Sequence, residues 1–282
     1  MVARMFHKTG LFMGSKLLGQ MPSNPYGHFE DLDIVQFHDR ALSRHGADWQ
    51  FSGDAQTLAF DDFEKQWLRQ CINKRDSHEH WGLKDPRLCL FLHEWTKACG
   101  DFFIVAIVRD FISTTRSLLD RHAGDLLRGW DARIHLRLWQ EPELPYRMWL
   151  SYNRHLLDIV RAFPDRSLIV HHSHALAGLD IPKLLQSRIG LRSSNASDMI
   201  DPTITQIGAS HLPQIGPELQ GSLLRTWLDI ERTAGASGVA VERMMQDAFD
   251  APKRRPDSSL EASTLRYDQA YQRYLAALRP RL

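Results

Sequence analysis

The feature that most constrains this fold is an uninterrupted apolar run at residues 102–108, FFIVAIV, which is followed at once by Arg109. A short run rich in Ile and Val predicts a strand buried on both faces, as in a parallel sheet. Residues 111–119 predict the start of a helix. Arg109 is therefore expected outside the carboxyl end of a strand, where open α/β sheets bind ligands. A guanidinium beside free helix N–H groups favours an anion, so a phosphate-bearing ligand is the first hypothesis.

Amphipathic patterns elsewhere predict helices that alternate with strands. The helices are expected at residues 2–8, 32–45, 60–74, 147–163, 182–189 and 219–233, with a second strand at 167–170. This alternation predicts an α/β fold with a central parallel sheet flanked by helices. The stretch 116–140 is expected to be a mobile surface segment, which either covers an anionic ligand or faces solvent. Its basic residues include Arg121, Arg128, Arg133 and Arg137.

A single domain is expected over residues 1–250, followed by a linker at 251–259 and a C-terminal helix at 260–282 that packs on the domain. The linker prediction rests on its charged and Pro-containing sequence, APKRRPDSS. The last helix carries a tyrosine stripe, for which packing is favoured over an aromatic ligand platform. The stripe consists of Tyr267, Tyr271 and Tyr274.

Composition excludes several classes of function. The net charge of +1 gives no overall field for nucleic acid or an acidic membrane. Three cysteines are too few for a disulfide framework and favour a reducing compartment. No apolar run approaches the roughly 20 residues of a membrane span, and the N-terminal sequence lacks the pattern of a signal peptide. A cytoplasmic location is therefore expected.

Four segments, in this order along the chain, point to one family. The first, LFMGSKLLGQMPSNPYGHFEDLDIVQFHDRAL, contains an Asn-Pro-x-Gly-x-x-Glu pattern, and the second is KDPR at 84–87. The third is IVRDFISTTRSLL, in which a serine follows the arginine by eight positions, and the fourth is WLSYNRHLL. Over roughly residues 1–175 the chain resembles bacterial sulfotransferases that use 3′-phosphoadenosine-5′-phosphosulfate (PAPS). In that family the second segment matches a Lys-x-Pro strand end and the third a 3′-phosphate motif.

The resemblance implies a P-loop-type three-layer fold, but one of its motifs has no counterpart here. The family's phosphosulfate loop, Gly-x-x-x-Ser-Gly-Thr-Ser after a strand, does not occur in the 282 residues. Residues 2–5 resemble the helix that this loop leads into, so the first strand and the loop are expected to be missing. Without the loop, the backbone N–H cradle for the 5′-phosphate is missing. The alternative is a catalytically inactive binding protein. A kinase ranks last because it needs a Gly-x-x-x-x-Gly-Lys-Ser/Thr loop.

The resemblance also implies roles for particular residues in sulfonate transfer from PAPS to a small-molecule or glycan hydroxyl, on a carbohydrate or glycolipid, without a metal. Arg109 and Ser117 would bind the 3′-phosphate, since a guanidinium grips two phosphate oxygens. Lys84 would bind the donor and stabilise shifting charge on the leaving group or sulfonate. Glu30 is the candidate general base. His28 and Asp31 are the alternatives, and His28 has an ordinary pKa close to 7.

Structural roles compete with these assignments. Arg109 could instead pair with Asp110 or Asp120, and Glu30 could cap the helix that starts at residue 32. Asp85 and Arg87 are expected to pair with each other or with neighbours rather than with a ligand.

Histidines raise a separate possibility. The sequence HHSH at 171–174, with His155 upstream, admits a metal site. No second ligand cluster occurs at metal-site spacing, so a solvated loop is favoured.

Overall fold

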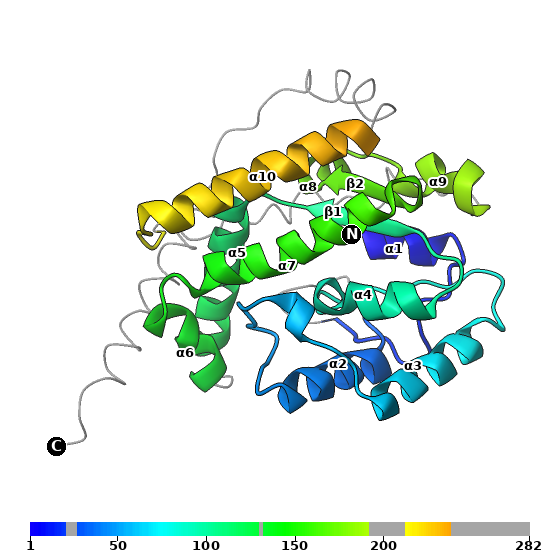
Figure 1. Cartoon of the computed structure of the whole chain (residues 1–282), viewed down its shortest axis with the longest axis horizontal. Coiled ribbons are helices and arrows are strands. Elements are labelled where there is room, and N and C mark those ends of the chain that lie inside the picture. The colour runs from blue at the N-terminus through cyan, green and yellow to red at the C-terminus, as the bar shows by residue number, and fades with distance from the viewer. Residues whose placement is uncertain (21–26, 130–131, 192–211, 238–282) are drawn as a thin grey trace.

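The computed structural model describes residues 1–20, 27–129, 132–191 and 212–237 (Figure 1). Its elements are α1 (Val2–Lys8), α2 (Leu32–Arg44), η1 (Ala55–Thr57), α3 (Asp62–Arg75), α4 (Leu88–Ala98), β1 (Ile104–Val108), α5 (Phe111–Leu127), α6 (Ala132–Gln140), α7 (Leu144–Ala162), η2 (Pro164–Arg166), β2 (Ser167–His171), α8 (His172–Leu176), α9 (Ile181–Ile189) and α10 (Pro217–Ser237). The mixed α/β class with parallel strands is confirmed. The expected linker, C-terminal helix and tyrosine stripe lie outside the described residues.

The two strands form a small parallel sheet. Their register runs from Ile104 opposite Ser167 to Val108 opposite His171. Parallel neighbours need a crossover connection, which α5, α6 and α7 supply here. The expectation that the 102–108 run is buried on both faces is wrong, because Ile107 is 36% exposed. A cleft opens beside β1, and Ile107 lines it.

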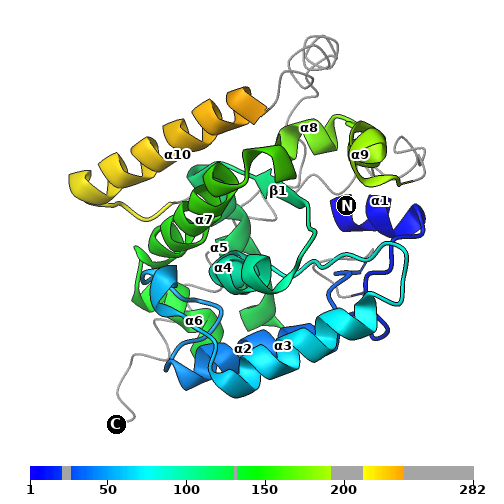
Figure 2. The same ribbon diagram turned by 45° about the vertical axis from the view of Figure 1, so that its right-hand side comes forward.

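Helices pack on two sides of this strand pair (Figure 1 and Figure 2). On one side α10 contacts both β2 and α7, and on the other α4 lies between α7 and the α2–α3 layer. Trp149 and Val160 of α7 pack with Ala106 and Ile169 of the strands in one apolar core. A second core joins α2, α3 and α4. Within the described ranges, no helix is long and apolar enough to cross a membrane.

Several helices begin at acidic caps. The Asp31 carboxylate accepts a hydrogen bond from the N–H of Asp33, at 3.1 Å, so Asp31 caps α2 and the alternative that Glu30 does so is wrong. The Asp110 carboxylate accepts from the N–H of Ser113, at 2.8 Å, and so caps α5. Such caps satisfy N–H groups that have no partner within the helix.

The expectation of a mobile segment at 116–140 is wrong. These residues form most of α5 and all of α6, which pack together through an apolar core. The core is formed by Leu119, Ala123, Leu126 and Leu138 with two α7 residues, Leu144 and Met148. The basic residues lie between these apolar positions at helical spacing, so a high charge density is compatible with a packed helix.

Gly14 is required where the N-terminal segment approaches α2. Its φ is +144°, and a Cβ there would lie 2.3 Å from Asp31 Oδ2. Asp31 is only 9% exposed, and it both caps α2 and pairs with Arg75 of α3. Gly14→Ala is therefore expected to lower the free energy of unfolding by about 2 kcal/mol or more. Urea denaturation measures this change.

Gly10 provides the matched control. Its φ is also positive, at +91°, but no atom lies within 4 Å of a Cβ built there. Gly10→Ala is expected to cost about 1 kcal/mol, from backbone strain alone. Equal losses in the two variants would contradict a steric role for Asp31.

Candidate functional site

A cleft of about 2290 Å³ opens beside β1. Its walls include α1, the segment 81–84, the exposed side of β1 and the start of α8. The polar residues that line it and bear on its chemistry are Arg4, His28, Lys84, Arg109, Ser113 and His172. Since three of the predicted site residues, His28, Lys84 and Arg109, line it, the cleft is the candidate functional site.

Lys84 reaches this cleft from an irregular segment. The expectation that it ends a strand is wrong, because only an isolated bridge, Phe12 with Trp81, precedes it and α4 follows. The next residue, Asp85, accepts a hydrogen bond from buried His38 at 2.8 Å and pairs with Arg87 at 3.0 Å. The expected pairing of Asp85 with Arg87 is thus confirmed, and it fixes the backbone next to Lys84.

Lys84, Glu30 and His28 lie together. The Lys84 ammonium donates to Glu30 Oε1, and His28 Nδ1 lies 3.7 Å from the same oxygen. Glu30 is only 5% exposed and does not line the cleft, whereas His28 does. The buried His28 Nε2 has no hydrogen-bond partner among the described residues. An orphaned buried nitrogen of this kind is costly unless a ligand supplies its partner.

Burial favours the neutral form of the His28 imidazole. Burial lowers the pKa of His28, and the positive charges of Lys84 and Arg121 lower it further, which outweighs the opposing effect of Glu30. A neutral imidazole can accept a proton, as a general base must.

The backbone that carries His28 and Glu30 is strained. Phe29, between them, has φ of +56°, which is uncommon for a residue other than glycine. Gly27, just before His28, has φ of +88°. Strain of this kind costs about 1–3 kcal/mol and concentrates at functional sites.

Arg109 is half-buried at the carboxyl end of β1, as the sequence predicts. Its carbonyl oxygen accepts a hydrogen bond from Trp149 Nε1 at 2.9 Å, which fixes the turn into α5. Within the described part of the chain, no carboxylate lies at ion-pair distance from its guanidinium, and Asp110 caps α5 instead. Burial lowers the pKa of Arg109, and Arg121 adds to this effect against Asp110.

Two expectations about this anion site need correction. The N–H groups at the start of α5 are not all free, because Asp110 occupies that of Ser113. Ser117 lies two turns along α5 and does not line the cleft. The structure therefore brings His28, Lys84 and Arg109 to one cleft, with Glu30 behind Lys84, and leaves Ser117 outside.

The expectation that the histidines at 171–174 form a solvated loop is wrong. His171 ends β2 and lies 3.4 Å from Glu231 of α10, and His172 begins α8. His172 lines the cleft, and burial lowers its pKa, with a further contribution from Arg109. The sequence placed His172 only among candidate metal ligands in the HHSH stretch, although it follows a strand end in the same way as Arg109.

Among known proteins, one similarity covers a small part of this chain. No protein-family model and no solved structure matches the chain. A stimulator of interferon genes protein homolog from Drosophila eugracilis is 31% identical over 68 residues, which is 22% of this chain and 20% of that protein. The chain therefore matches about a fifth of the length of this curated relative.

Proposed function

We propose that the cleft binds PAPS and that the protein transfers its sulfonate to a hydroxyl of a carbohydrate, glycolipid or other small acceptor. The observation that carries this proposal is the Arg109 guanidinium. It is half-buried at the end of a parallel strand, and no carboxylate among the described residues lies at ion-pair distance from it. A half-buried cation in this position favours a phosphate, which a guanidinium can bind through two oxygens.

The proposed fold is a P-loop-type three-layer fold, in which β1 and β2 belong to a larger parallel sheet. Two observations support this extension. β1 has a strand neighbour on one side, β2, and its exposed Ile107 lines the cleft. The cleft is also lined by Leu83 and Lys84, the segment that resembles the family's Lys-x-Pro strand end.

The residues of the cleft supply what sulfonate transfer requires, which is a base, a cation and fixed positions. PAPS would supply the sulfonate, and its 3′-phosphate would bind Arg109. Lys84 would exchange the Glu30 carboxylate for the anionic oxygens of the donor. His28 would take the acceptor's hydroxyl proton on Nε2, with Glu30 positioning the ring from the Nδ1 side. The acceptor oxygen would then form a bond to sulfur while the bond between sulfur and the bridging oxygen of the 5′-phosphate breaks. The leaving group would be 3′-phosphoadenosine-5′-phosphate.

A non-catalytic binding protein is the second candidate. It is favoured by the lack of a Gly-x-x-x-Ser-Gly-Thr-Ser sequence in the 282 residues.

Arg109→Ala is expected to weaken binding of 3′-phosphoadenosine-5′-phosphate, the spent donor. Loss of a charge-assisted bidentate contact costs about 2 kcal/mol or more, which is about 30-fold in the dissociation constant. Calorimetric titration measures it. Arg225→Ala, on the exposed side of α10, is the control and should bind like the wild type.

The outcomes of this titration separate the candidates. Binding that depends on Arg109, together with sulfonate transfer from PAPS to a panel of sugars, supports the enzyme. Binding that depends on Arg109 without transfer supports the binding protein. No binding by the wild-type chain at millimolar nucleotide would overturn both.

A further inference from the structure

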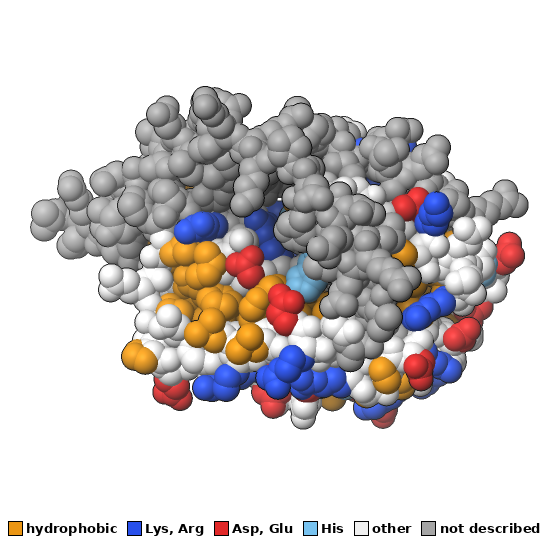
Figure 3. All heavy atoms as spheres, turned by 90° about the horizontal axis from the view of Figure 1, so that it is seen from above, with side chains coloured by type: hydrophobic (Ala, Val, Ile, Leu, Met, Phe, Trp, Pro, Cys, Tyr) orange, Lys and Arg blue, Asp and Glu red, His pale blue; other side chains and the backbone are white. Residues whose placement is uncertain are grey.

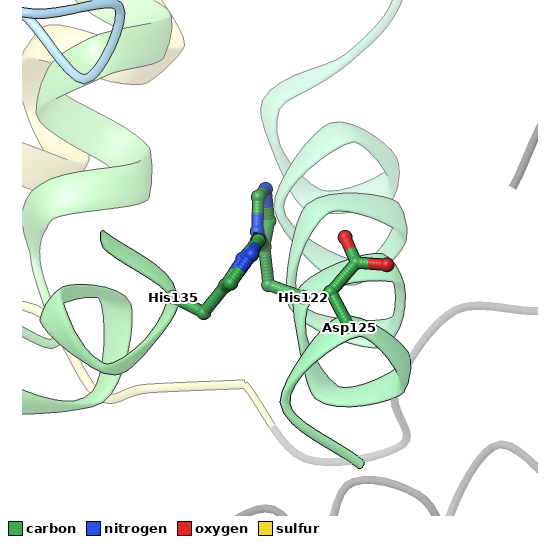
Figure 4. Close-up of side chains that lie close together, drawn as sticks. All are labelled: His122, Asp125 and His135. Atoms are coloured by element: carbon green, nitrogen blue, oxygen red, sulfur yellow. Dashed lines mark hydrogen bonds between the residues drawn. The ribbon is translucent and has the colours of Figure 1, made fainter. Parts of the chain in front are cut away.

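A cluster of metal-ligating side chains lies between α5 and α6, away from the cleft (Figure 4). His122 and Asp125 come from neighbouring turns of α5, and His135 comes from α6. One ligand atom from each of the three lies within 4.8 Å of the others. His122 is 6% exposed and Asp125 is 5% exposed, so the cluster is largely shielded from water.

The two histidine rings face each other through the same type of atom. His122 Nδ1 and His135 Nδ1 are 2.5 Å apart. A hydrogen bond between two ring nitrogens needs one that carries no proton, so the pair presents at least one nitrogen lone pair that a metal ion can use.

The loop before η1 holds the cluster from a third side. The Trp49 ring stacks on His122 at 5.2 Å between centroids. Gln50 is fully buried, and its Nε2 donates to the carbonyl of Ile134, the residue before His135, at 3.0 Å. Gln50 Oε1 has no hydrogen-bond partner among the described residues. This loop therefore carries a fully buried amide oxygen that still needs a donor.

From this geometry we propose that His122, Asp125 and His135 bind a divalent transition-metal ion of the Zn²⁺ type. Two imidazoles and one carboxylate are ligands that such ions prefer, and Mg²⁺ or Ca²⁺ would require oxygen ligands instead. Tetrahedral Zn²⁺ with bonds of about 2.0–2.1 Å places two nitrogens about 3.3 Å apart. The histidine nitrogens therefore need to separate by less than an ångström. Three protein ligands leave one position for water.

The Asp125 carboxylate already has a partner. It pairs at 3.0 Å with Arg128, the residue that directly follows α5. The Arg128 side chain is 42% exposed, so water can solvate its guanidinium when Asp125 turns to the ion. Binding would then tie α6 to the helix that starts next to Arg109, and so raise the stability of the folded chain by linkage.

Co²⁺ is the probe for this site, because its visible absorption reports ligand number and Zn²⁺ displaces it. The full chain, stripped of metal with a chelator, is expected to bind one equivalent of Co²⁺. His122→Ala and His135→Ala should each weaken binding at least about tenfold, and Asp125→Asn, which keeps the side-chain shape, should weaken it in the same direction. His7→Ala is the matched control, since it removes an exposed histidine outside the cluster.

Zn²⁺ should also raise the melting temperature of the wild type and of His7→Ala, but not of His122→Ala or His135→Ala. Circular dichroism of each metal-free variant shows whether it is folded, and Asp125→Asn provides the test if a histidine variant is not. Co²⁺ that binds equally well to Asp125→Asn and to a histidine variant would overturn the proposal. Failure of the wild type to bind Co²⁺ more tightly than these variants would also overturn it.

Discussion

Asp85→Asn is expected to lower the free energy of unfolding by about 3–5 kcal/mol at pH 7, since breaking a buried pair leaves its partners uncompensated. The Asp85 side chain is 2% exposed and accepts hydrogen bonds from His38 at 2.8 Å and from the Arg87 backbone at 2.9 Å. Trp95 Nε1 donates a hydrogen bond to His38 Nε2 at 2.9 Å. The proton of the His38 ring is therefore on Nδ1, which donates a hydrogen bond to Asp85. An amide at position 85 offers fewer lone pairs to these donors.

Asp39→Asn is the control for this prediction. Asp39 pairs with the same Arg87, at 2.6 Å, but its side chain is 46% exposed. Its loss should cost about 1 kcal/mol or less, because solvent screens the pair. Urea denaturation of both variants measures the difference, and equal losses would contradict the role assigned to burial.

The same network predicts acid sensitivity. Burial alone would raise the pKa of Asp85, but the hydrogen bond from His38 and the charge of Arg87 lower it to about 2. The pKa in the unfolded chain is about 3.9. Because the folded value is the lower one, Asp85 adds stability above about pH 4, and this contribution is lost as the pH falls toward 2. The wild type should therefore lose more stability than Asp85→Asn between pH 5 and pH 3. Parallel pH profiles would contradict the assignment.

Local patterns in the sequence predicted much of the fold, and distant contacts explain what they missed. The two strands and the helices around 2–8, 32–45, 60–74, 147–163, 182–189 and 219–233 are present, with ends shifted by a few residues. Their apolar positions repeat with the period of a helix or a short strand, which neighbouring residues decide. The helix α4 was missed because its sequence, LCLFLHEWTKA, resembles a continuous buried run. Such runs do not separate helix from strand by periodicity.

The candidate site also contains residues that a local pattern predicts and residues that only distant contacts bring together. Arg109 could be placed because the end of an apolar run is visible in the sequence. The contact between Lys84 and Glu30 joins residues 54 positions apart, and no local pattern predicts it. The cluster of His122 and His135 was missed because both histidines lie in the 116–140 stretch, for which the sequence predicted a mobile surface segment. Ser117 was assigned to the 3′-phosphate by the resemblance, and a matching motif does not fix which side of α5 the residue occupies in this chain.

The molecule exposes apolar side chains on α10, on the face shown in Figure 3. Leu224 is 46% exposed and Leu228 is 55% exposed, whereas Leu223 and Ile230 of the same helix are buried. The buried side of α10 faces α7. The ring centroids of Trp227 in α10 and Trp149 in α7 are 6.3 Å apart. Trp149 therefore connects α10 with the turn that carries Arg109.

Trp149→Ala is expected to lower the free energy of unfolding by about 3–5 kcal/mol, the usual cost of removing a large buried aromatic side chain. Trp149 is 4% exposed and packs against Phe111, at 5.7 Å between ring centroids. Its Nε1–H also donates to the Arg109 carbonyl at 2.9 Å. Urea denaturation measures the loss. A change below about 1 kcal/mol would mean that the surrounding core refills the space, contrary to this prediction.

Trp149→Phe separates packing from positioning. Phenylalanine keeps an aromatic ring in the core but has no donor for the Arg109 carbonyl, so the cost in stability should be about 1–2 kcal/mol. If the hydrogen bond positions the guanidinium for a phosphate, Trp149→Phe should also weaken binding of 3′-phosphoadenosine-5′-phosphate, while the protein stays folded at the temperature of the titration. Nucleotide affinity equal to that of the wild type would show instead that β1 and Asp110 alone hold Arg109 in place. The contribution of Trp149 would then be confined to the core between α7 and α10.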